Sequence, residues 1–253
     1  GSHFLLTPAS VPTSSSLFPL KKSILRIEYD ITDEQAAFAV LGDVALHSIR
    51  RGQIQIDESV AIFGQGVVGQ MITAFCKLSG AFPVIAIDMD AKRLEMAKLR
   101  GATHTINATK ENAIERVLEL TDGGVQCVFH ATRDPKVLVD CMKVTADRAK
   151  VVLAGSPPGT VELGLQVELL RHELDIRGVY GRGLESNPHP YWPWSRQRNR
   201  KAIMRMIASG ELIVDDLISH VAKPEEANDL YNKIMEGTTG WMSVFFNWED
   251  GDL

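Results

Sequence analysis

The sequence predicts an α/β protein whose doubly wound parallel sheet carries helices on both faces. Short apolar, β-branched runs alternate along its 253 residues with segments whose apolar residues recur at helical spacing. Residues 64–69 place three glycines between one such run and one such segment. Strands that alternate with helices in this way favour a parallel sheet covered on both sides.

An irregular arm is expected at residues 1–30. Gly1-Ser2-His3 has the composition of an expression-tag remnant, and residues 4–23 hold three prolines without sustained periodicity. Residues 24–29 then alternate like a strand.

A helix is predicted next. Thr32 and Gln35 have the spacing of a capping box, and apolar residues continue at helical spacing to Ile49. Arg50-Arg51-Gly52 supplies the positive charge and the glycine that end a helix.

The glycine turn is the motif most informative about function. Residues 60–63 form an apolar run that ends at the first glycine, and Gly64, Gly66 and Gly69 have G-x-G-x-x-G spacing. The first glycine reverses the chain, the second lets backbone approach a pyrophosphate, and the third lets the helix pack on the strand. N–H groups of the first helical turn, which contains Val67 and Val68, then face the phosphates. This predicts a Rossmann dinucleotide site; the alternative is a glycine turn without a ligand.

Asp88 follows Gly69 by 19 residues, at the end of the next predicted strand, residues 84–88. A carboxylate there can accept both hydroxyls of an adenosine ribose and would repel a 2′-phosphate, so NAD is favoured over NADP. Lys92 or Arg93 could instead reach a 2′-phosphate, and Arg93 is kept as a candidate cofactor contact.

Further strands and helices alternate downstream. Strands are predicted at residues 125–129, 151–154 and 174–180, and helices at residues 90–100, 110–120 and 135–144.

Small residues follow these strands and are candidates for a second set of cofactor contacts. They are Ala131 and Thr132 after the fourth strand, Gly155 and Ser156 after the fifth, and residues 178–181 after the sixth. Turn chemistry alone is the alternative for each. His130 could point into the same crevice, although a histidine at a strand end is more often structural.

Residues 187–201 combine prolines and aromatic residues with a basic helical segment. Trp192 and Trp194 could cap an apolar pocket or bury a partner surface, and the cations could meet phosphate or an acidic substrate. A loop packed on its own domain is the alternative. Beyond it, residues 214–217 form an apolar run, a helix is expected at residues 224–237 and a strand at residues 241–248.

Composition limits the partners. Apolar residues make up 45% of the chain and charged residues 23%, and the net charge is −5, so no basic surplus attracts nucleic acid or anionic lipid. No apolar run approaches the length of a membrane span. Cys76, Cys127 and Cys141 lack C-x-x-C pairing and lie in apolar runs, which indicates buried thiols of a reducing compartment, most simply the cytoplasm.

The order of these segments resembles the medium-chain dehydrogenase/reductase superfamily, which includes the zinc-type alcohol dehydrogenases. The matching phrases are residues 33–38, 44–47, 64–69, 93–97 with 101–102, 176–178 and 224–227. The resemblance runs from about residue 31 to the end, and Gln197-Arg198-Asn199 is similar to a zinc-independent branch. It implies hydride transfer between a nicotinamide ring and a small-molecule alcohol, carbonyl or activated alkene.

The chain departs from the family pattern in two ways. Full members begin with a GroES-like catalytic domain, which is largely missing here, so no catalytic residue can be named. Val40 stands where zinc-bearing members offer Glu or Cys, so no catalytic metal is expected. Asp43 and His47 lie one helical turn apart but make a poor zinc site without further ligands.

The resemblance also suggests the domain organisation. Residues 1–30 would form the arm, residues 31–220 an NAD-binding domain with its leading helix, and residues 221–253 a helix and strand that return to the catalytic domain. Because the family commonly dimerises through the sixth strand, a homodimer through residues 174–180 is expected. The last strand would pair with residues 24–29 or with another chain.

We therefore predict an NAD-dependent oxidoreductase without zinc. The alternative is a non-catalytic dinucleotide-binding or regulatory module, because the pocket domain is missing. A methyltransferase-like sheet is less favoured, since its glycine turns rarely end in G-x-x-G.

Overall fold

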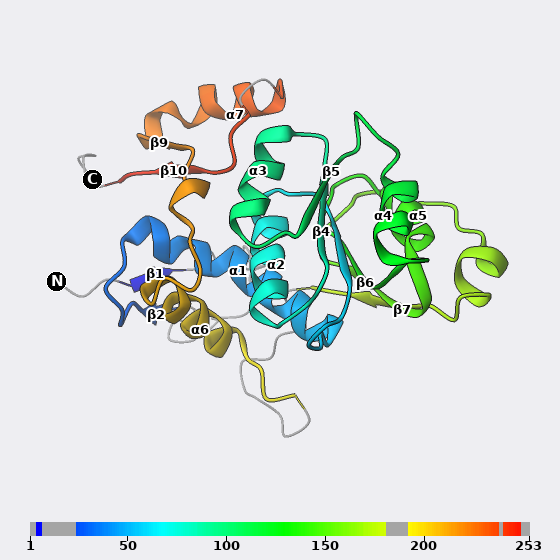
Figure 1. The fold of residues 1–253 in the computed structure, drawn as a ribbon. Coiled ribbons are helices and arrows are strands. Elements are labelled where there is room, and N and C mark those ends of the chain that lie inside the picture. The colour runs from blue at the N-terminus through cyan, green and yellow to red at the C-terminus, as the bar shows by residue number, and fades with distance from the viewer. Residues whose placement is uncertain (1–3, 7–23, 181–191, 238–239, 249–253) are drawn as a thin grey trace, which may run out of the picture. The chain divides into compact units, whose positions relative to one another are not determined.

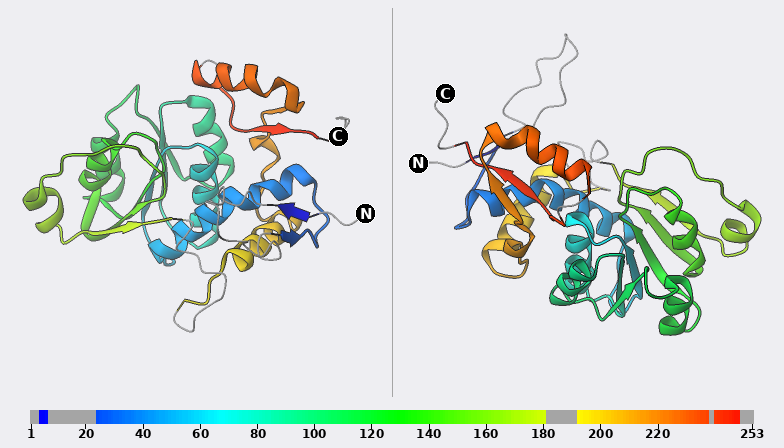
Figure 2. Two further views of the ribbon diagram at one scale, coloured as in Figure 1. Left: turned by 180° about the vertical axis from the view of Figure 1, so that it is seen from behind. Right: turned by 90° about the horizontal axis from the view of Figure 1, so that it is seen from above.

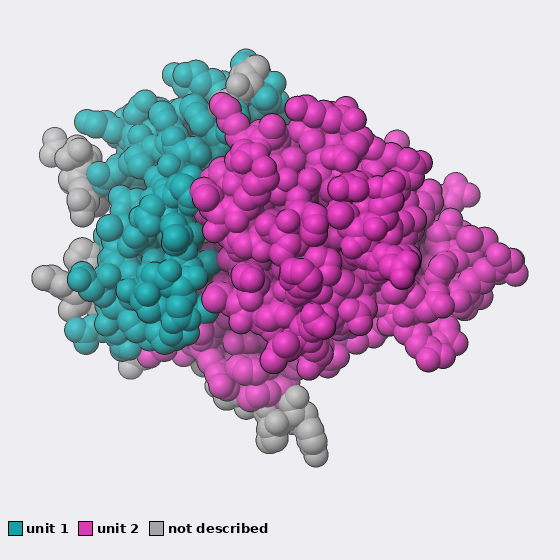
Figure 3. All heavy atoms as spheres, viewed as in Figure 1, with its two compact units in different colours: residues 1–38, 204–253 teal, residues 39–203 magenta. Residues whose placement is uncertain are grey.

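The computed structural model describes residues 4–6, 24–180, 192–237 and 240–248. The chain separates into two compact units (Figure 3), of which unit 1 comprises residues 1–38 and 204–253 and unit 2 comprises residues 39–203. Their boundaries fall inside two helices, α1 (Asp33–Gly52) and α6 (Arg196–Ala208). The division expected at residues 30 and 220 follows sequence elements rather than compactness and stays a prediction.

Unit 2 is built on a six-stranded sheet in which all neighbouring strands are parallel. From edge to edge the strands are β5 (His104–Asn107), β4 (Val84–Asp88), β3 (Val60–Phe63), β6 (Val125–His130), β7 (Thr145–Leu153) and β8 (Asp175–Gly178). The order of strands reverses between β3 and β6, which makes their carboxyl ends the switch point of a doubly wound fold. The predicted fold class is confirmed.

Helices cover both faces of this sheet (Figures 1 and 2). On one face lie α2 (Val67–Leu78) and α3 (Ala91–Leu99), and on the other lie α4 (Ala113–Thr121) and α5 (Val137–Lys143). Side chains alternate along each strand, so Ile85 and Ile87 of β4 pack in the cluster beneath α4 and α5, whereas Ala86 packs against Leu94 and Ala97 of α3. The sheet is therefore buried on both faces, which explains why its central strands are continuously apolar.

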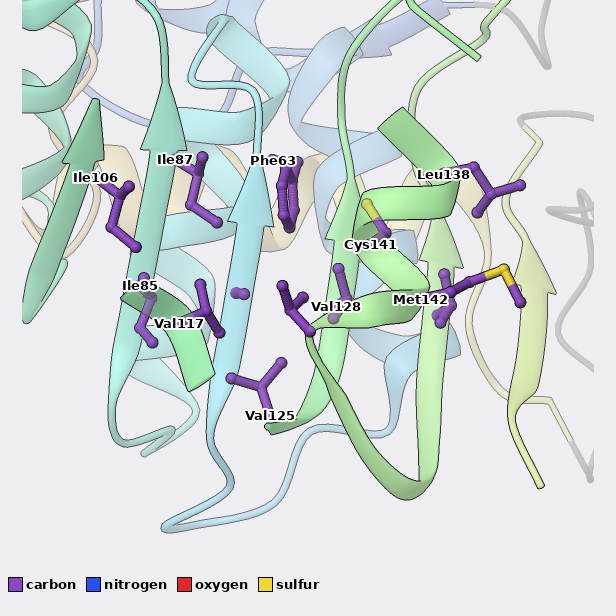
Figure 4. Close-up of a cluster of buried hydrophobic side chains, with 13 residues drawn as sticks. Phe63, Ile85, Ile87, Ile106, Val117, Val125, Val128, Leu138, Cys141 and Met142 are labelled. Carbon is purple, nitrogen blue, oxygen red and sulfur yellow. The ribbon is translucent and has the colours of Figure 1, made fainter. Parts of the chain in front are cut away.

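Figure 4 shows the apolar cluster beneath α4 and α5. Val128 of β6 lies among Leu138, Cys141 and Met142 of α5, and all four side chains are at most 8% exposed. Burying one such side chain contributes roughly 1.5–3 kcal/mol, so this cluster holds the strands whose ends form the site.

Two strands differ from the sequence prediction. No apolar run marks β5, because this polar edge strand buries only Ile106. β7 begins at Thr145 rather than Val151, since its charged first half still pairs with the start of β6 across a register shift. Between β7 and β8 lies a short π-helix, Leu165–Leu170.

Unit 1 contains two small sheets. β1 (Phe4–Leu6) pairs antiparallel with β2 (Ile24–Arg26), and β9 (His220–Ala222) pairs in parallel with β10 (Val244–Phe246). The expected pairing of residues 24–29 with the last strand is therefore wrong. The last strand, β10, pairs instead with β9, which is too short to show alternation in the sequence.

Short helices complete unit 1. They are the 3-10 turns Asp215–Leu217 and Pro224–Glu226, the second of which leads into α7 (Ala227–Met235). The predicted apolar run at residues 214–217 is thus helical, and the helix expected at residues 224–237 is confirmed as these last two elements.

The capping box of α1 is confirmed. The backbone N–H of Thr32 donates to Gln35 Oε1 at 3.0 Å, and that of Gln35 donates to Thr32 Oγ1 at 3.2 Å. The helix continues through Gly52, and Gln53, at φ +51°, takes the left-handed conformation that ends it.

Among the helices of the described ranges, none combines the length and the apolar composition that a membrane span requires.

Candidate functional site

The glycine turn lies between β3 and α2, as the sequence predicts. Gly64 has φ +93°, a conformation that L side chains rarely adopt. A Cβ added there would also stand 2.9 Å from the carbonyl oxygen of Ala131, which follows β6. Gly64 is thus required both by the turn and by the close approach of the neighbouring strand end.

Gly69 and Gly66 have opposite surroundings. A Cβ on Gly69 would stand 1.9 Å from the carbonyl oxygen of Gly64, so the helix packs on the turn only because this side chain is absent. A Cβ on Gly66 would meet nothing within 4 Å, and φ −71° there is open to any residue. Protein packing therefore requires Gly69, whereas only a ligand would require Gly66.

The N-terminus of α2 is open. The first helical bond runs from the N–H of Gln70 to the carbonyl of Gly66 at 2.9 Å, so the amides of Gly66, Val67, Val68 and Gly69 precede it. Among the residues that the structure describes, no side chain caps this helix. With the helix dipole, these N–H groups suit a pyrophosphate.

Asp88, the last residue of β4, lies directly beside the turn. Its Oδ2 accepts a hydrogen bond from the N–H of Gln65 at 2.6 Å, and its Oδ1 accepts one from the N–H of Asp90 at 2.9 Å. An ionised carboxylate offers about four acceptor positions, so both oxygens can still accept ribose hydroxyls. Asp88 thus orders the turn and fits the predicted ribose-binding role.

A buried polar network supports the turn from below, and the sequence reasoning did not find it. The side chains of Gln65, Gln70 and Thr73 are fully buried. Thr73 Oγ1 lies 3.1 Å from Gln65 Oε1, and Gln70 Nε2 donates to the carbonyl of Arg93 at 2.7 Å. No pattern in the sequence marks these three residues, because a buried polar side chain is recognised only by its internal partners.

Arg93 lies at the start of α3, on the side of the turn where Asp88 stands. Its Nε is 3.9 Å from Asp90 Oδ2, and the side chain is 34% exposed. Contact of this guanidinium with a cofactor ribose or 2′-phosphate stays a prediction.

The loops after β6 and β7 meet beside the glycine turn. The N–H of Ala131 donates to the carbonyl of Phe63 at 2.8 Å, and a Cβ on Gly155 would stand 2.3 Å from the carbonyl oxygen of Thr132. Ala131, Thr132 and Gly155 therefore lie close to Gly64, at the carboxyl ends of the strands. Ser156 follows on the exposed side. Close backbone approach alone accounts for Gly155, so cofactor contacts by these residues stay a prediction.

His130 is buried at the end of β6. Its Nε2 lies 3.0 Å from the carbonyl oxygen of Asp134 and 3.2 Å from Thr132 Oγ1. Burial lowers the pKa of His130, so the ring is neutral at pH 7. These contacts give the residue a structural task, tying the loop after β6.

Asp43 and His47, the pair considered as metal ligands in the sequence, are both buried. Asp43 Oδ1 accepts a hydrogen bond from Asn199 Nδ2 at 2.7 Å. Burial, then the charges of Arg51 and Arg50, lowers the pKa of His47 to about 4. Within the part of the chain that the structure describes, no group of three or more His, Cys, Asp or Glu side chains is arranged to hold a metal ion.

The three cysteines are buried free thiols, as predicted. Burial raises the pKa of each, that of Cys127 to about 12, so none is a reactive thiolate at pH 7. Part of the predicted aromatic loop, residues 187–191, and Gly181 lie outside the described residues.

A model of the zinc-binding dehydrogenase family matches residues 67–196, just over half of the chain. L-threonine 3-dehydrogenase from Pyrococcus horikoshii is 30% identical over 198 residues, which cover 78% of this chain and 53% of that protein. Sorbitol dehydrogenase from Bacillus subtilis is 31% identical over 181 residues, covering 70% of this chain and 51% of that one. The chain thus spans about half the length of these curated relatives.

A solved structure agrees in fold. Alcohol dehydrogenase from Thermus sp. ATN1 matches with a TM-score of 0.75 at 24% identity, covering 88% of this chain and 61% of that chain.

Proposed function

The chain belongs to the zinc-binding dehydrogenase family, within the medium-chain dehydrogenase/reductase superfamily, and from that premise we propose that it is the NAD-binding part of an oxidoreductase. The reaction is hydride transfer between nicotinamide and an alcohol, a carbonyl or an activated alkene. The relatives' names support a dehydrogenase. Because the chain covers about half of their length, its activity and substrate are proposals.

The open N-terminus of α2 beside Asp88 is the observation that carries this proposal. Gly66 has free space where a side chain would point, and the adjoining amides precede the first helical bond. Asp88 fixes the turn and keeps acceptor positions for a ribose. Anion-binding amides and a sugar-binding carboxylate, side by side at a switch point, fit a dinucleotide without a 2′-phosphate.

The residues of this chain bind and orient the cofactor, whose nicotinamide ring, when bound, takes up or gives the hydride. We propose that no zinc takes part, because Val40 cannot serve as a ligand where zinc-bearing members offer Glu or Cys. Metal analysis of the purified protein tests this point. No catalytic residue is assigned.

We also propose that the chain forms a homodimer through β8, an edge strand of the sheet. Sedimentation tests this, and a monodisperse monomer would contradict it. The buried free thiols favour a reducing compartment such as the cytoplasm.

Calorimetric titration with NADH and NADPH, repeated on Asp88→Ala, tests the proposed function. We expect NADH to bind the unaltered chain more tightly than NADPH. The variant loses two charge-assisted hydrogen bonds to the ribose, so its NADH affinity should fall by about tenfold or more. Its NADPH affinity should fall less, because a repulsive charge has been removed.

A smaller ratio of NADH affinity to NADPH affinity in the variant would indicate loss of ribose recognition. Damage to the turn would instead weaken the binding of both dinucleotides equally. Asp147→Ala, which removes an exposed carboxylate on β7, is the matched control and should leave both affinities unchanged. If neither dinucleotide binds the unaltered chain, the proposal fails. Binding of NADH without turnover of any alcohol or carbonyl would favour the alternative of a non-catalytic module.

A further inference from the structure

A second group of polar and aromatic residues lies in unit 2, outside the glycine turn. We name it the arginine–tryptophan cluster, and its members are Asp43, His47 and Arg50 of α1 with Trp192, Trp194, Arg196, Arg198, Asn199 and Arg200. At its centre, the Cζ atoms of Arg50 and Arg198 lie 3.8 Å and 4.3 Å from the centroid of the Trp194 ring. The cluster thus holds two guanidinium groups against one indole.

Positive charge exceeds negative charge in the cluster. Its carboxylate, Asp43, is shared by two guanidinium groups, since Nε of Arg196 and Nε of Arg200 each lie 3.8 Å from its Oδ2. Among the described residues, no carboxylate forms a salt bridge with Arg50 or Arg198. The charge of Asp43 also acts on Arg50, and Arg198 Nη1 donates to the carbonyl of Pro193 at 3.0 Å. The remaining donors of these two guanidinium groups have capacity for a further anion.

Arg50 also has an unsatisfied donor. Its Nη1 is buried without a hydrogen-bond partner among the described residues, as is Nδ1 of His47. Burial, then the charge of Arg198, lowers the pKa of Arg50 to about 10, so the group stays protonated at pH 7. A buried, charged donor without an acceptor is costly, and an oxyanion is the partner that a guanidinium fork fits best.

The α1 segment that carries the cluster contacts α2 and β8. Gly42 packs against Met71 in the first half of α2, and the carbonyl of Arg51 accepts a hydrogen bond from Arg177 Nη1 of β8 at 2.6 Å. Asp88, the predicted ribose ligand, lies at the end of β4, so the adenosine is expected over the half of the sheet formed by β3, β4 and β5. The other mononucleotide then lies over the half that contains β8.

We propose that the arginine–tryptophan cluster binds a carboxylate or phosphate group of the substrate, with Arg50 and Arg198 as the oxyanion ligands and Trp194 as the apolar plane beside it. The assignment to a substrate rests on the proposed function, because it takes hydride transfer at the nicotinamide half as given. The oxyanion site itself stands on the contacts of the cluster. The substrate class is thus an anionic alcohol or carbonyl compound.

Titration with inorganic phosphate and with benzoate tests this site, with tryptophan fluorescence as the readout and ionic strength held constant with chloride. We expect saturable binding of at least one probe, and the stronger probe identifies phosphate or carboxylate as the ligand. Arg50→Gln and Arg198→Gln should each weaken that binding by about tenfold. Arg148→Gln removes the same charge from an exposed side chain paired with Glu173, and should leave binding unchanged.

Arg198 keeps the test valid if Arg50→Gln fails to fold, because its side chain is exposed. Arg198→Lys retains the charge but not the planar fork, and should bind the probe more weakly than the unaltered chain. Absence of saturable binding, or equal weakening by Arg148→Gln, would overturn the site.

Saturating NADH separates this inference from the proposed function. If probe binding persists beside bound NADH, the substrate assignment is supported. If NADH displaces the probe, the oxyanion belongs to the cofactor and the substrate assignment is overturned. If the probe binds but no dinucleotide does, the oxyanion site is supported while its role toward a substrate is lost together with the proposed function.

Discussion

The helices α2 and α3 begin at the carboxyl ends of the neighbouring strands β3 and β4, and their N-termini differ in capping. At the start of α3, Asp90 accepts hydrogen bonds from the N–H groups of Lys92 at 2.8 Å and Arg93 at 3.4 Å. At the start of α2, Gly66 offers no side chain, and no other described residue caps the helix. A capped end satisfies its own amides, whereas an open end reserves them for a ligand.

The difference shows how binding capacity is built into a helix terminus. A cap of the α3 kind contributes about 1 kcal/mol to stability. The α2 terminus forgoes that contribution, and Asp88 and Gln65 hold its turn in place by another route. The open amides are thus both uncapped and ordered, which is the combination that anion binding needs.

Gly69→Ala should break the α2 terminus most severely. The new Cβ would stand 1.9 Å from the carbonyl oxygen of Gly64, so the turn and the helix must separate. We expect a loss of about 3 kcal/mol in the free energy of unfolding, together with loss of NADH binding. Urea denaturation and calorimetry measure the two effects. An unchanged unfolding midpoint would contradict the packing role of Gly69.

Gly66→Asp should convert the open terminus into a capped one. Its side chain enters free space, can accept hydrogen bonds from the first-turn amides and places a negative charge where the pyrophosphate would lie. NADH affinity should fall by about 100-fold, since a repulsive charge replaces charge-assisted hydrogen bonds. The unfolding free energy should rise by up to about 1 kcal/mol. Loss of binding through unfolding would show instead as a lower melting temperature.

Asp90→Ala makes the reciprocal change at α3 and should have the smallest effect. Removing the cap should cost about 1 kcal/mol of stability. NADH affinity should change less than twofold, because Asp88 and the glycine turn remain. A large fall in affinity, measured by the same titration, would mean that the α3 terminus belongs to the site.

The parts of the site that the sequence predicts are those set by local backbone geometry. Gly64 and Gly69 are required by a positive φ and a close approach within six residues, and Asp88 follows at the end of the next strand. Such constraints leave residue types at fixed spacing. Gln65 and Thr73 carry no such signal, because a buried polar side chain is recognised only by its partners.

The pairing of the last strand was mispredicted for a related reason. β9 has three residues, and alternation cannot be read over so short a run. β10 pairs with β9 although α7 lies between them in the chain. β2 falls in the strand predicted at residues 24–29, but its partner β1 lies in the segment that the sequence predicts to be irregular.

By itself the sequence determined the doubly wound sheet, the strand–turn–helix unit around residues 60–78, and a carboxylate at the end of the next strand. Periodicity and glycine spacing predict these features because each feature constrains residues that are close together in the sequence. Only the tertiary structure decided that Asp88 braces the turn, that α2 is left open while α3 is capped, and that Arg50 meets Trp194. The last contact joins segments more than a hundred residues apart, and its energy depends on burial and charge that no local pattern records.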